Sequence, residues 1–356
     1  MRIVQMLPTL AYGDAIGNNV IAINDALVSA GYDTDIFAEG IDKKIPSGTA
    51  RLVSAYKDSA DTIILYHLST GTELNEKIKK FKARVFVVYH NVTPPEFWHG
   101  YDYEHEKRCA AGVESVKALA KTPEYCIADS AFNKSDLISY GYTCPVDVLP
   151  ILIRFSDYEK KPDQKTIDRL SDDVTNIVFT GRVAPNKKQQ DLITSFYYYH
   201  KFVNQKSRLI IAGSFQNSDI YYRKLEAYTK ELGLEDAVEF TGHIPFDQIL
   251  AIYRTADLLL CLSEHEGFCV PLVEAMYFGI PIIAYDSTAI AETLGGSGIL
   301  LKDKDPKIVS EAINLVVTDE GLRNKLIEGE KARLADFDND KIKARLIELL
   351  KSQIGE

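Results

Sequence analysis

A predicted helix start near residue 270 carries the residues best suited to bind a phosphate. The segment Glu266-Gly-Phe-Cys-Val-Pro-Leu-Val-Glu274 follows an apolar run, Leu258–Leu262, and opens a helix at about its proline. Gly267 permits a tight turn, and the N–H groups of a helix start favour phosphate. Glu266 and Glu274 flank this turn, where their carboxylates can accept hydrogen bonds from hydroxyls. The alternative, a helix-start acid beside a solvated glutamate, leaves most of the pattern unexplained.

A second loop supplies positive charge. Gly181 and Arg182 come directly after the apolar run Asn176–Thr180, and Lys187 follows in the same loop. Glycine allows close backbone approach, and a guanidinium fork beside an ammonium suits a diphosphate. The alternative is an ordinary solvated basic loop. Because this basic loop lies in the same half of the chain as the Glu266 segment, we expect the two to form one anion-binding site.

Short apolar runs alternate with helical stretches along the whole chain, which predicts parallel sheets covered by helices. The strands predicted in the first half are Arg2–Leu7, Asp35–Ala38, Thr62–Tyr66, Arg84–Tyr89, Tyr125–Ala128 and Asp147–Leu149. Those in the second half are Asn176–Thr180, Arg208–Ala212, Val238–Thr241, Leu258–Leu262, Pro281–Ala284 and Gly298–Leu301. The helices predicted between the first strands are Asn18–Ala30, Thr72–Phe81, Tyr103–Leu119 and Lys134–Tyr140.

The polar segment Pro150–Asp173 interrupts this alternation and is typical of a connector. We therefore predict an α/β protein with two Rossmann-like, doubly wound parallel-sheet domains facing a cleft. The first domain comprises residues 1–150 plus about 337–356, where KIKARLIELLKSQI predicts an amphipathic helix, and the second comprises residues 151–336. Ligands of open α/β sheets bind at the carboxyl ends of the strands, so the loops after strands should hold the site.

In order, these motifs resemble the retaining GT-B glycosyltransferases of family 4. That family has G-R-x-x-x-x-K, then a strand ending in A-G, then V/I-x-F-x-G, then E-G-F-x-x-P-x-x-E-A-x-x-x-G-x-P. The matching segments here are Gly181 to Lys187, Ala212-Gly213, Val238 to Gly242, and Glu266 to Pro281. Lys188 and Cys269 depart from the pattern, because glycine is common at both positions.

The resemblance implies a role for each residue of these motifs. Arg182 and Lys187 would bind the diphosphate of a nucleotide-sugar donor and stabilise the charge on the leaving group. Glu266 would contact the transferred sugar, and Glu274 would bind the ribose. The remaining donor contacts would be the backbone N–H groups of Gly267, Phe268, Cys269 and Val270, with His243 and Ile244 lining the base pocket.

The first domain matches the family pattern less closely. Its loop after the first strand contains Gly13 and Gly17 as candidate substrate contacts, and it lacks the G-x-G-x-x-G of nicotinamide dehydrogenases. His90 ends a buried strand where the family often places a histidine near the donor sugar, so it is a catalytic candidate. His67 and Ser130 have the same strand-end placement, Ser130 as a candidate hydrogen-bond donor.

Composition narrows the class of protein. A formal net charge of -10 argues against a nucleic-acid-binding surface. The 5 cysteines, odd in number and without C-x-x-C spacing, predict reduced, mostly buried thiols. We interpret the apolar run at the N-terminus as a strand and not as a signal peptide, and no run reaches the roughly 20 residues of a spanning helix. These observations predict a cytoplasmic protein.

No metal site and no cofactor are predicted. The Asp-x-Asp pairs that begin at Asp33, Asp303 and Asp336 are interpreted as solvated turns. Arg182, Lys187 and the helix start would supply the positive charge that a diphosphate leaving group needs. The basic stretch Glu76–Arg84 predicts a solvated helix face; the alternative is contact with the inner face of a membrane or with a lipid-diphosphate acceptor.

The predicted partners are a nucleotide-diphosphate sugar and a glycan or lipid-linked acceptor in surface polysaccharide synthesis. The resemblance implies transfer with retention of anomeric configuration. GDP-mannose is the leading donor on a family-level hint, the strand-end histidines in YHLST and YHNVTPP, with UDP-hexoses and dTDP-rhamnose left open. Two alternatives keep the fold: a nucleotide-sugar epimerase, and a non-enzymatic nucleotide-sugar-binding protein.

Overall fold

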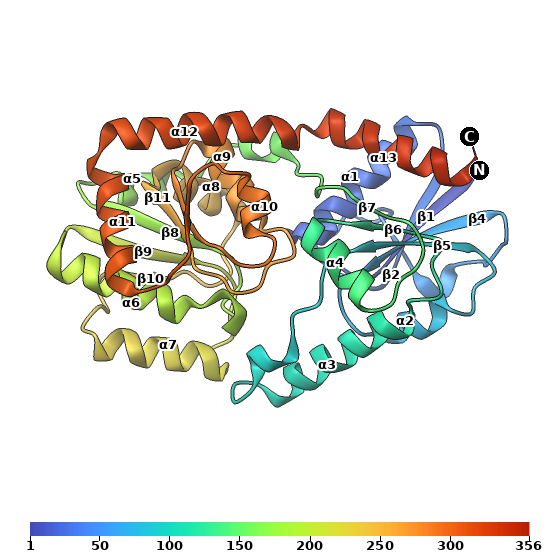
Figure 1. Ribbon diagram of the computed structural model, residues 1–356, viewed down its shortest axis with the longest axis horizontal. Coiled ribbons are helices and arrows are strands. Elements are labelled where there is room, and N and C mark those ends of the chain that lie inside the picture. Colours follow the sequence, from blue (N-terminus) through green and yellow to red (C-terminus); the bar gives the residue numbers. More distant parts are fainter. Residues whose placement is uncertain (356) are drawn as a thin grey trace. The chain divides into compact units, whose positions relative to one another are not determined.

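The computed structural model describes residues 1–355 and divides into two compact units. Unit 1 comprises Met1–Glu96, Glu104–Arg154 and Phe337–Glu356, and unit 2 comprises Phe97–Tyr103 and Phe155–Asp336. The segment Phe97–Tyr103 thus packs with unit 2, although it lies in the first half of the sequence. Each unit is an α/β layer structure with its own sheet (Figure 1).

Unit 1 contains a 7-stranded sheet in the order β3-β2-β1-β4-β5-β6-β7, in which every pair is parallel. Its strands are β1 (Arg2–Leu10), β2 (Asp33–Ile41), β3 (Arg51–Leu52), β4 (Thr62–Leu68), β5 (Arg84–Tyr89), β6 (Tyr125–Ala128) and β7 (Val146–Val148). Its helices are α1 (Ala15–Ser29), α2 (Glu73–Ile78), α3 (Tyr103–Ala118), α4 (Ala131–Ser139) and α13 (Asn339–Ile354). This strand order is doubly wound, with its switch point between β1 and β4.

Alternate residues of the central strands bury the two faces of this sheet. Val4 and Ile64 pack in one core with side chains of α2, α3 and α4. Ile3 and Ile63, one residue earlier on the same strands, pack in a second core with α1 and with Leu346 of α13. The C-terminal helix (red) therefore lies against α1 (blue) and closes the N-terminal unit (Figure 1).

Unit 2 repeats the plan with a 6-stranded parallel sheet in the order β10-β9-β8-β11-β12-β13. Its strands are β8 (Thr175–Thr180), β9 (Ser207–Ala212), β10 (Val238–Phe240), β11 (Leu258–Cys261), β12 (Ile282–Tyr285) and β13 (Ile299–Leu301). Its helices are α5 (Gln164–Leu170), α6 (Gln189–Phe202), α7 (Ile220–Glu231), α8 (Phe246–Thr255), α9 (Val270–Phe278), α10 (Ile290–Leu294), α11 (Pro306–Thr318) and α12 (Glu320–Leu334). The switch point of this sheet lies between β8 and β11.

The sheet of unit 2 is also covered on both faces. Ile177 and Phe179 of β8 pack with α6, α7 and α11, and α6 and α11 lie side by side (Figure 1). Val178, between them in the strand, points to the opposite face and packs with Leu170 of α5 and Ile252 of α8. These two buried faces explain why β8 appears in the sequence as a continuous apolar run.

The prediction of two parallel-sheet α/β domains is confirmed, and each predicted strand is present within a few residues of its predicted bounds. Two local predictions were wrong, and one short element was not predicted. The edge strand β3 left no signal in the sequence, because it has two residues and both are exposed. The expected connector Pro150–Asp173 contains α5, which packs on α8. The basic stretch Glu76–Arg84 is not one amphipathic helix, because α2 ends at Ile78.

Glu330 on α12 makes the stability of the protein depend on pH. Its side chain is buried, its Oε1 accepts a hydrogen bond from the N–H of Ile282 at 2.9 Å, and burial raises its pKa to about 8. The folded protein therefore holds this proton above pH 4.5, where the unfolded chain loses it. The resulting stabilisation is complete below about pH 4.5 and falls as pH rises towards 8, by up to about 1.4 kcal/mol per pH unit.

We expect Glu330→Gln to remove this pH dependence and to stabilise the protein at pH 8 and above. Urea unfolding of the wild type and the variant between pH 5 and 9 measures both quantities. An unchanged slope of unfolding free energy against pH in the variant would contradict the assignment.

Candidate active site

Two loops of unit 2 leave the sheet at its switch point, where an open α/β sheet binds its ligands. One follows β8 and runs from Gly181 to Lys188; the other follows β11 and runs from Leu262 to Cys269. Strands β8 and β11 pair directly, with Leu258 opposite Ile177 and Leu259 opposite Val178. The carboxyl ends of the two strands therefore bring the basic loop and the Glu266 loop together.

Close backbone packing explains the glycines after β8 and β9. A Cβ atom built on Gly213 would lie 1.9 Å from the carbonyl oxygen of Gly181, a separation that no side chain can adopt. Gly181 itself has φ +143° and donates its N–H to Ala212 O at 2.9 Å. The glycine after β9 thus allows the backbone of the loop after β8 to pack against it. This contact fixes the position of the backbone at Arg182.

Lys187 and Glu266 form the central contact of the site. Lys187 Nζ lies 2.5 Å from Glu266 Oε2, and only 9% of the Glu266 side chain is exposed. Burial lowers the pKa of Lys187, but the Glu266 carboxylate together with Cys269 and Cys261 more than offsets this effect, so the pKa is raised. Residues 79 positions apart in the chain therefore hold a cation and an anion side by side at the switch point.

Further polar contacts fix the two loops to each other. Asn186 Nδ2 donates to the carbonyl oxygen of His265 at 3.0 Å, and Glu264 N–H donates to Asn186 O at 2.9 Å. Glu264 then accepts from Lys188 at 2.9 Å and from Lys304 at 2.5 Å. The loops form a preorganised unit, which is what electrostatic catalysis requires.

The two positions where glycine is common in the family have left-handed backbone. Lys188 has φ 52° and Cys269, the N-cap of α9, has φ 73°. Such conformations cost a non-glycine residue of the order of 1 kcal/mol. Lys188 and Cys269 therefore keep the left-handed backbone conformation, although glycine would adopt it without strain.

Glu274 lies one turn into α9 and is held by two tyrosines. Tyr158 Oη donates to its Oε1 at 2.8 Å, and Tyr253 Oη donates to its Oε2 at 2.5 Å. Burial raises the pKa of Glu274, and the two hydroxyl donors lower it by a smaller amount. The carboxylate is thus oriented from both sides, and each oxygen keeps a lone pair for a further donor.

An aromatic segment that sequence reasoning did not single out contacts the basic loop. The Arg182 guanidinium lies over the Trp98 ring, 5.5 Å from its centre, and Lys188 Nζ lies 5.9 Å from the centre of the Phe97 ring. Phe97 also contacts the His265 ring, with 6.0 Å between centres. The run F-W-H-G-Y-D-Y was the available signal, since so many aromatic residues in one predicted loop are unusual.

The predicted base-pocket residues follow β10. His243 is exposed and Ile244 is half-buried, directly after Gly242, which has φ +67°. They belong to the same unit as the Lys187–Glu266 pair.

The strand ends of unit 1 hold a buried hydrogen-bonded chain. Gln5 Oε1 and His67 Nε2 are 2.9 Å apart, His67 Nδ1 and His90 Nε2 are 2.9 Å apart, and His90 Nδ1 and Asp129 Oδ2 are 2.7 Å apart. Burial, and then the neighbouring His90, lower the pKa of His67 well below its usual range. Gln5 Nε2 donates to Val20 O, so its Oε1 accepts the proton of a neutral His67.

The direction of each hydrogen bond along this chain follows from the contact between His67 and Gln5. Because His67 Nε2 donates to Gln5, His67 Nδ1 must accept, and His90 Nε2 must donate. His90 Nδ1 and Asp129 Oδ2, 2.7 Å apart, then share the next proton of the chain. Both ring nitrogens of His90 are engaged inside unit 1, and its side chain is 1% exposed. Asp129, which the sequence did not single out, completes the chain.

The other candidates of unit 1 have structural contacts that the sequence did not show. Ser130 is the N-cap of α4, and its Oγ accepts from Asn133 N–H at 3.1 Å. Gly17 N–H donates to the Asp14 carboxylate, and a Cβ on Gly17 would lie 2.6 Å from Ala11 O. Gly13 has φ +76° in the exposed turn before α1.

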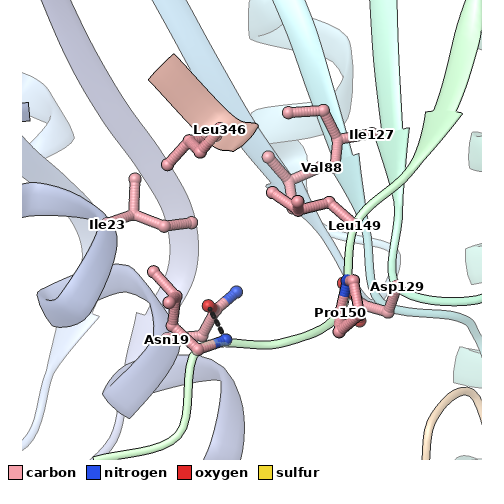
Figure 2. A pocket seen from close by; sticks show the side chains of 9 residues that line it. Asn19, Ile23, Val88, Ile127, Asp129, Leu149, Pro150 and Leu346 are labelled. Atoms are coloured by element: carbon pink, nitrogen blue, oxygen red, sulfur yellow. Dashed lines mark hydrogen bonds between the residues drawn. The ribbon is translucent and has the colours of Figure 1, made fainter. Parts of the chain in front are cut away.

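A small pocket in unit 1 lies beside Asp129 (Figure 2). It is walled by Asn19, Ile23 and Leu346 on one side and by Val88, Ile127 and Leu149 on the other, and Asn19 Oδ1 accepts from Leu152 N–H at 3.0 Å. Its volume is about 10 Å³, room for about one water molecule. This pocket cannot hold a sugar, so the loops at the strand ends stay the candidate ligand sites.

Comparison with known proteins identifies the second unit. Residues 160–333, which lie within unit 2 and include both loops at its switch point, match the family described as Glycosyl transferases group 1. The chain carries a group 1 glycosyl transferase domain. Arg182, Lys187, Glu266 and Glu274 all lie inside this group 1 domain.

One relative is the GalNAc-alpha-(1->4)-GalNAc-alpha-(1->3)-diNAcBac-PP-undecaprenol alpha-1,4-N-acetyl-D-galactosaminyltransferase of Campylobacter jejuni. It is 26% identical over 64% of this chain and 60% of its own length. The aligned part thus spans less than two thirds of that relative.

Solved structures extend the likeness to the whole fold. Sucrose-phosphate synthase from Thermosynechococcus elongatus superposes with a TM-score of 0.78 at 16% identity, covering 100% of both chains. HepE from Anabaena, solved in complex with UDP-glucose, gives a TM-score of 0.74 at 17% identity over 99% of this chain and 100% of its own. The predicted GT-B fold is confirmed: the group 1 domain is the second of its two parallel-sheet domains.

In the described part of the chain, no helix combines the length and apolar character needed to cross a bilayer.

Proposed function

We propose that this protein transfers a hexose from a nucleotide-diphosphate sugar to a hydroxyl of a glycan or lipid-linked acceptor, with retention of configuration. The observation that carries the proposal is the Lys187–Glu266 pair, 2.5 Å apart at the switch point of a group 1 domain. There, a cation suits the diphosphate and a carboxylate suits the hydroxyls of the sugar. The relatives named above support this class of reaction, in that one is an N-acetylgalactosaminyltransferase and another binds UDP-glucose.

In this proposal the residues divide the donor between them. Arg182 and Lys187 bind the diphosphate, and they stabilise the negative charge that grows on it as the glycosidic bond breaks. The N–H groups of the α9 start hold phosphate or sugar oxygens. Glu266 contacts the sugar, Glu274 the ribose, and His243 and Ile244 the base.

The strand-end candidates His67, His90 and Ser130 carry no carboxylate, and Asp129 beside them is buried against His90. Retention without a protein nucleophile implies that the acceptor attacks the sugar on the face from which the leaving group departs. A phosphate oxygen of the leaving group then takes the proton of the acceptor hydroxyl. His90 is buried and hydrogen-bonded to both His67 and Asp129, so in this scheme it fixes the loop after β5. Its direct contact with the sugar stays a prediction. The lipid-linked acceptor and contact with a membrane surface are likewise proposals.

A donor screen tests the proposed function. The purified protein is incubated with GDP-mannose, UDP-glucose, UDP-N-acetylgalactosamine and dTDP-rhamnose, with and without acceptor glycans, and products are identified by mass spectrometry. We expect nucleoside diphosphate and a glycan one hexose heavier, formed only when both substrates are present. Conversion of the donor to an epimer without acceptor, or binding without turnover, would replace the proposal with one of its two alternatives.

We expect transfer to be independent of added divalent metal. The side chains Arg182 and Lys187 and the start of α9 provide the positive charge that a metal supplies elsewhere. Activity in excess EDTA should therefore stay within about twofold of the untreated enzyme, once the reaction is followed by nucleoside diphosphate release. Loss of activity in EDTA that magnesium or manganese restores would contradict metal independence.

Trp98 should act as a positioning residue for Arg182. A cation–π contact of about 1 kcal/mol corresponds to about a fivefold change in rate. We expect Trp98→Leu to lower kcat about fivefold with little change in nucleoside affinity, and Trp98→Phe to restore much of the loss. Trp98 is the 1 tryptophan of the chain, so its fluorescence in the wild type should also respond to nucleoside diphosphate. Equal losses in Trp98→Leu and Trp98→Phe would argue against a role for the ring.

A further inference from the structure

Two cysteines and a glutamate surround one point beside the loop after β11. Cys261 is the last residue of β11, Cys269 is the N-cap of α9, and Glu266 lies between them in the chain. All three are buried. Their ligand atoms lie within 4.8 Å of one another, and the two Sγ atoms are 3.9 Å apart. The sequence did not predict this group, because its two cysteines are spaced by eight residues and match no common metal motif.

We propose that Cys261, Glu266 and Cys269 form a binding site for a thiophilic divalent cation such as Zn²⁺, and that occupancy of this site inhibits transfer.

The distance between the two sulfurs favours a metal over a disulfide. A tetrahedral zinc ion with Zn–S bonds of about 2.3 Å places two thiolate sulfurs about 3.8 Å apart. A disulfide requires about 2.05 Å, so the sulfurs would have to approach by nearly 2 Å. The observed 3.9 Å is close to the separation of two sulfurs on one zinc ion.

The charges of the buried cluster also balance. Lys187 Nζ contacts Glu266 Oε2, and with two neutral thiols this cluster carries no net charge. A dication that displaces two thiol protons leaves the sum unchanged: two thiolates and one carboxylate against Zn²⁺ and the lysine ammonium. The exchange therefore avoids the large cost of burying net charge. Lys187 can stay on one carboxylate oxygen while the other oxygen of Glu266 binds the metal.

We expect inhibition because the metal would bind Glu266 and Cys269, two residues of the proposed donor site. This expectation rests on the proposed function. Glu266 is the proposed sugar contact, and Cys269 belongs to the helix start proposed to bind phosphate. Three protein ligands leave the fourth position of a tetrahedral ion open, to be filled by water. A bound ion would thus fix the donor loop in one arrangement and divert Glu266 from the sugar.

Binding is tested separately from activity. Protein freed of metal by chelation under reducing conditions is titrated with Zn²⁺ by calorimetry in buffers of different protonation enthalpy. We expect one ion per chain with release of about two protons, and a tetrahedral absorption spectrum when Co²⁺ is the probe. In the wild type, Zn²⁺ should protect Cys261 and Cys269 from alkylation, as mapped by mass spectrometry, and should leave Cys109 unprotected.

Variants locate the site. Cys269→Gly removes one ligand at a residue with φ 73°, where glycine fits without strain, so this variant should fold. We expect Cys269→Gly and Cys261→Ser to weaken Zn²⁺ binding at least tenfold. The paired variant Cys126→Ser with Cys144→Ser is the control, because these two thiols lie 3.5 Å apart in unit 1 but are not part of this cluster.

The proposal fails if the wild type binds no stoichiometric Zn²⁺, or if binding survives in Cys269→Gly, or if it is lost in the control pair. Inhibition is measured on whichever donor and acceptor turn over, and EDTA should reverse it. Stoichiometric binding without inhibition would keep the site and overturn its effect on transfer. A protein that binds Zn²⁺ but has no transferase activity would leave the site in place and refute the proposed function alone.

Discussion

Arg182→Ala and Lys187→Ala should each lower kcat about 10²- to 10³-fold, the usual cost of removing one preorganised donor to a developing charge. The affinity for the free nucleoside should change little, because both cations are proposed to bind the diphosphate and not the nucleoside. Steady-state kinetics with the best donor, and calorimetry with the nucleoside, measure the two quantities. Equal losses in nucleoside affinity and in turnover would place these residues at the base or ribose instead.

The Lys187 variant carries a second, structural expectation. It leaves the buried Glu266 carboxylate without its cation, so Lys187→Ala should also lower the free energy of unfolding, by about 1–3 kcal/mol. Lys188→Gly is the matched control: it removes a cation one residue away and relieves a left-handed backbone position. We expect Lys188→Gly to keep kcat within a few fold of the wild type, which separates a local role of Lys187 from a general loss of positive charge.

Glu274→Ala should weaken the donor and the nucleoside diphosphate alike, whereas Glu266→Ala should spare the nucleoside diphosphate. A carboxylate that accepts hydrogen bonds from a ribose contributes about 1.5–3 kcal/mol, so the expected loss in Glu274→Ala is about tenfold to a hundredfold. In Glu266→Ala, Lys187 is released from its partner, and the free ammonium should hold the diphosphate at least as well. Calorimetry with both ligands on both variants gives the comparison.

A control for Glu274 comes from the tyrosines that orient it. Tyr158→Phe removes one of the two hydroxyl donors and leaves the carboxylate in place. We expect it to lose less nucleoside diphosphate affinity than Glu274→Ala. A large loss of that affinity in Glu266→Ala, with little loss in Glu274→Ala, would reverse the division of roles.

The sequence predicted the elements that position the site, because buried parallel strands leave continuous apolar runs. It also predicted that the loops after β8 and β11 belong together, from the types and order of their residues. It could not predict that Lys187 contacts Glu266 at 2.5 Å. That distance depends on the pairing of β8 with β11 and on the backbone path that Gly213 permits, both of which involve distant parts of the chain.

The same limit explains what was missed in unit 1 and around residue 98. His67 and His90 were noted one by one as strand-end residues, yet only the adjacency of β4, β5 and β6 joins them to Asp129 in one hydrogen-bonded chain. Trp98 has no motif, and its contact with Arg182 arises because Phe97–Tyr103 packs with unit 2. Contacts of this kind carry no local pattern that a single sequence can show.

The anomeric configuration of the transferred sugar tests the proposed mechanism most directly. The proposed donor site, built from Arg182, Lys187 and Glu266, offers no protein nucleophile. In the proposed mechanism the acceptor therefore attacks on the face from which the diphosphate departs. Proton NMR of the product, recorded early in the reaction with the donor found by the screen, reports this configuration from the coupling of the anomeric proton. We expect the same configuration as in the donor; an inverted product would contradict both the proposed mechanism and the resemblance to the retaining family.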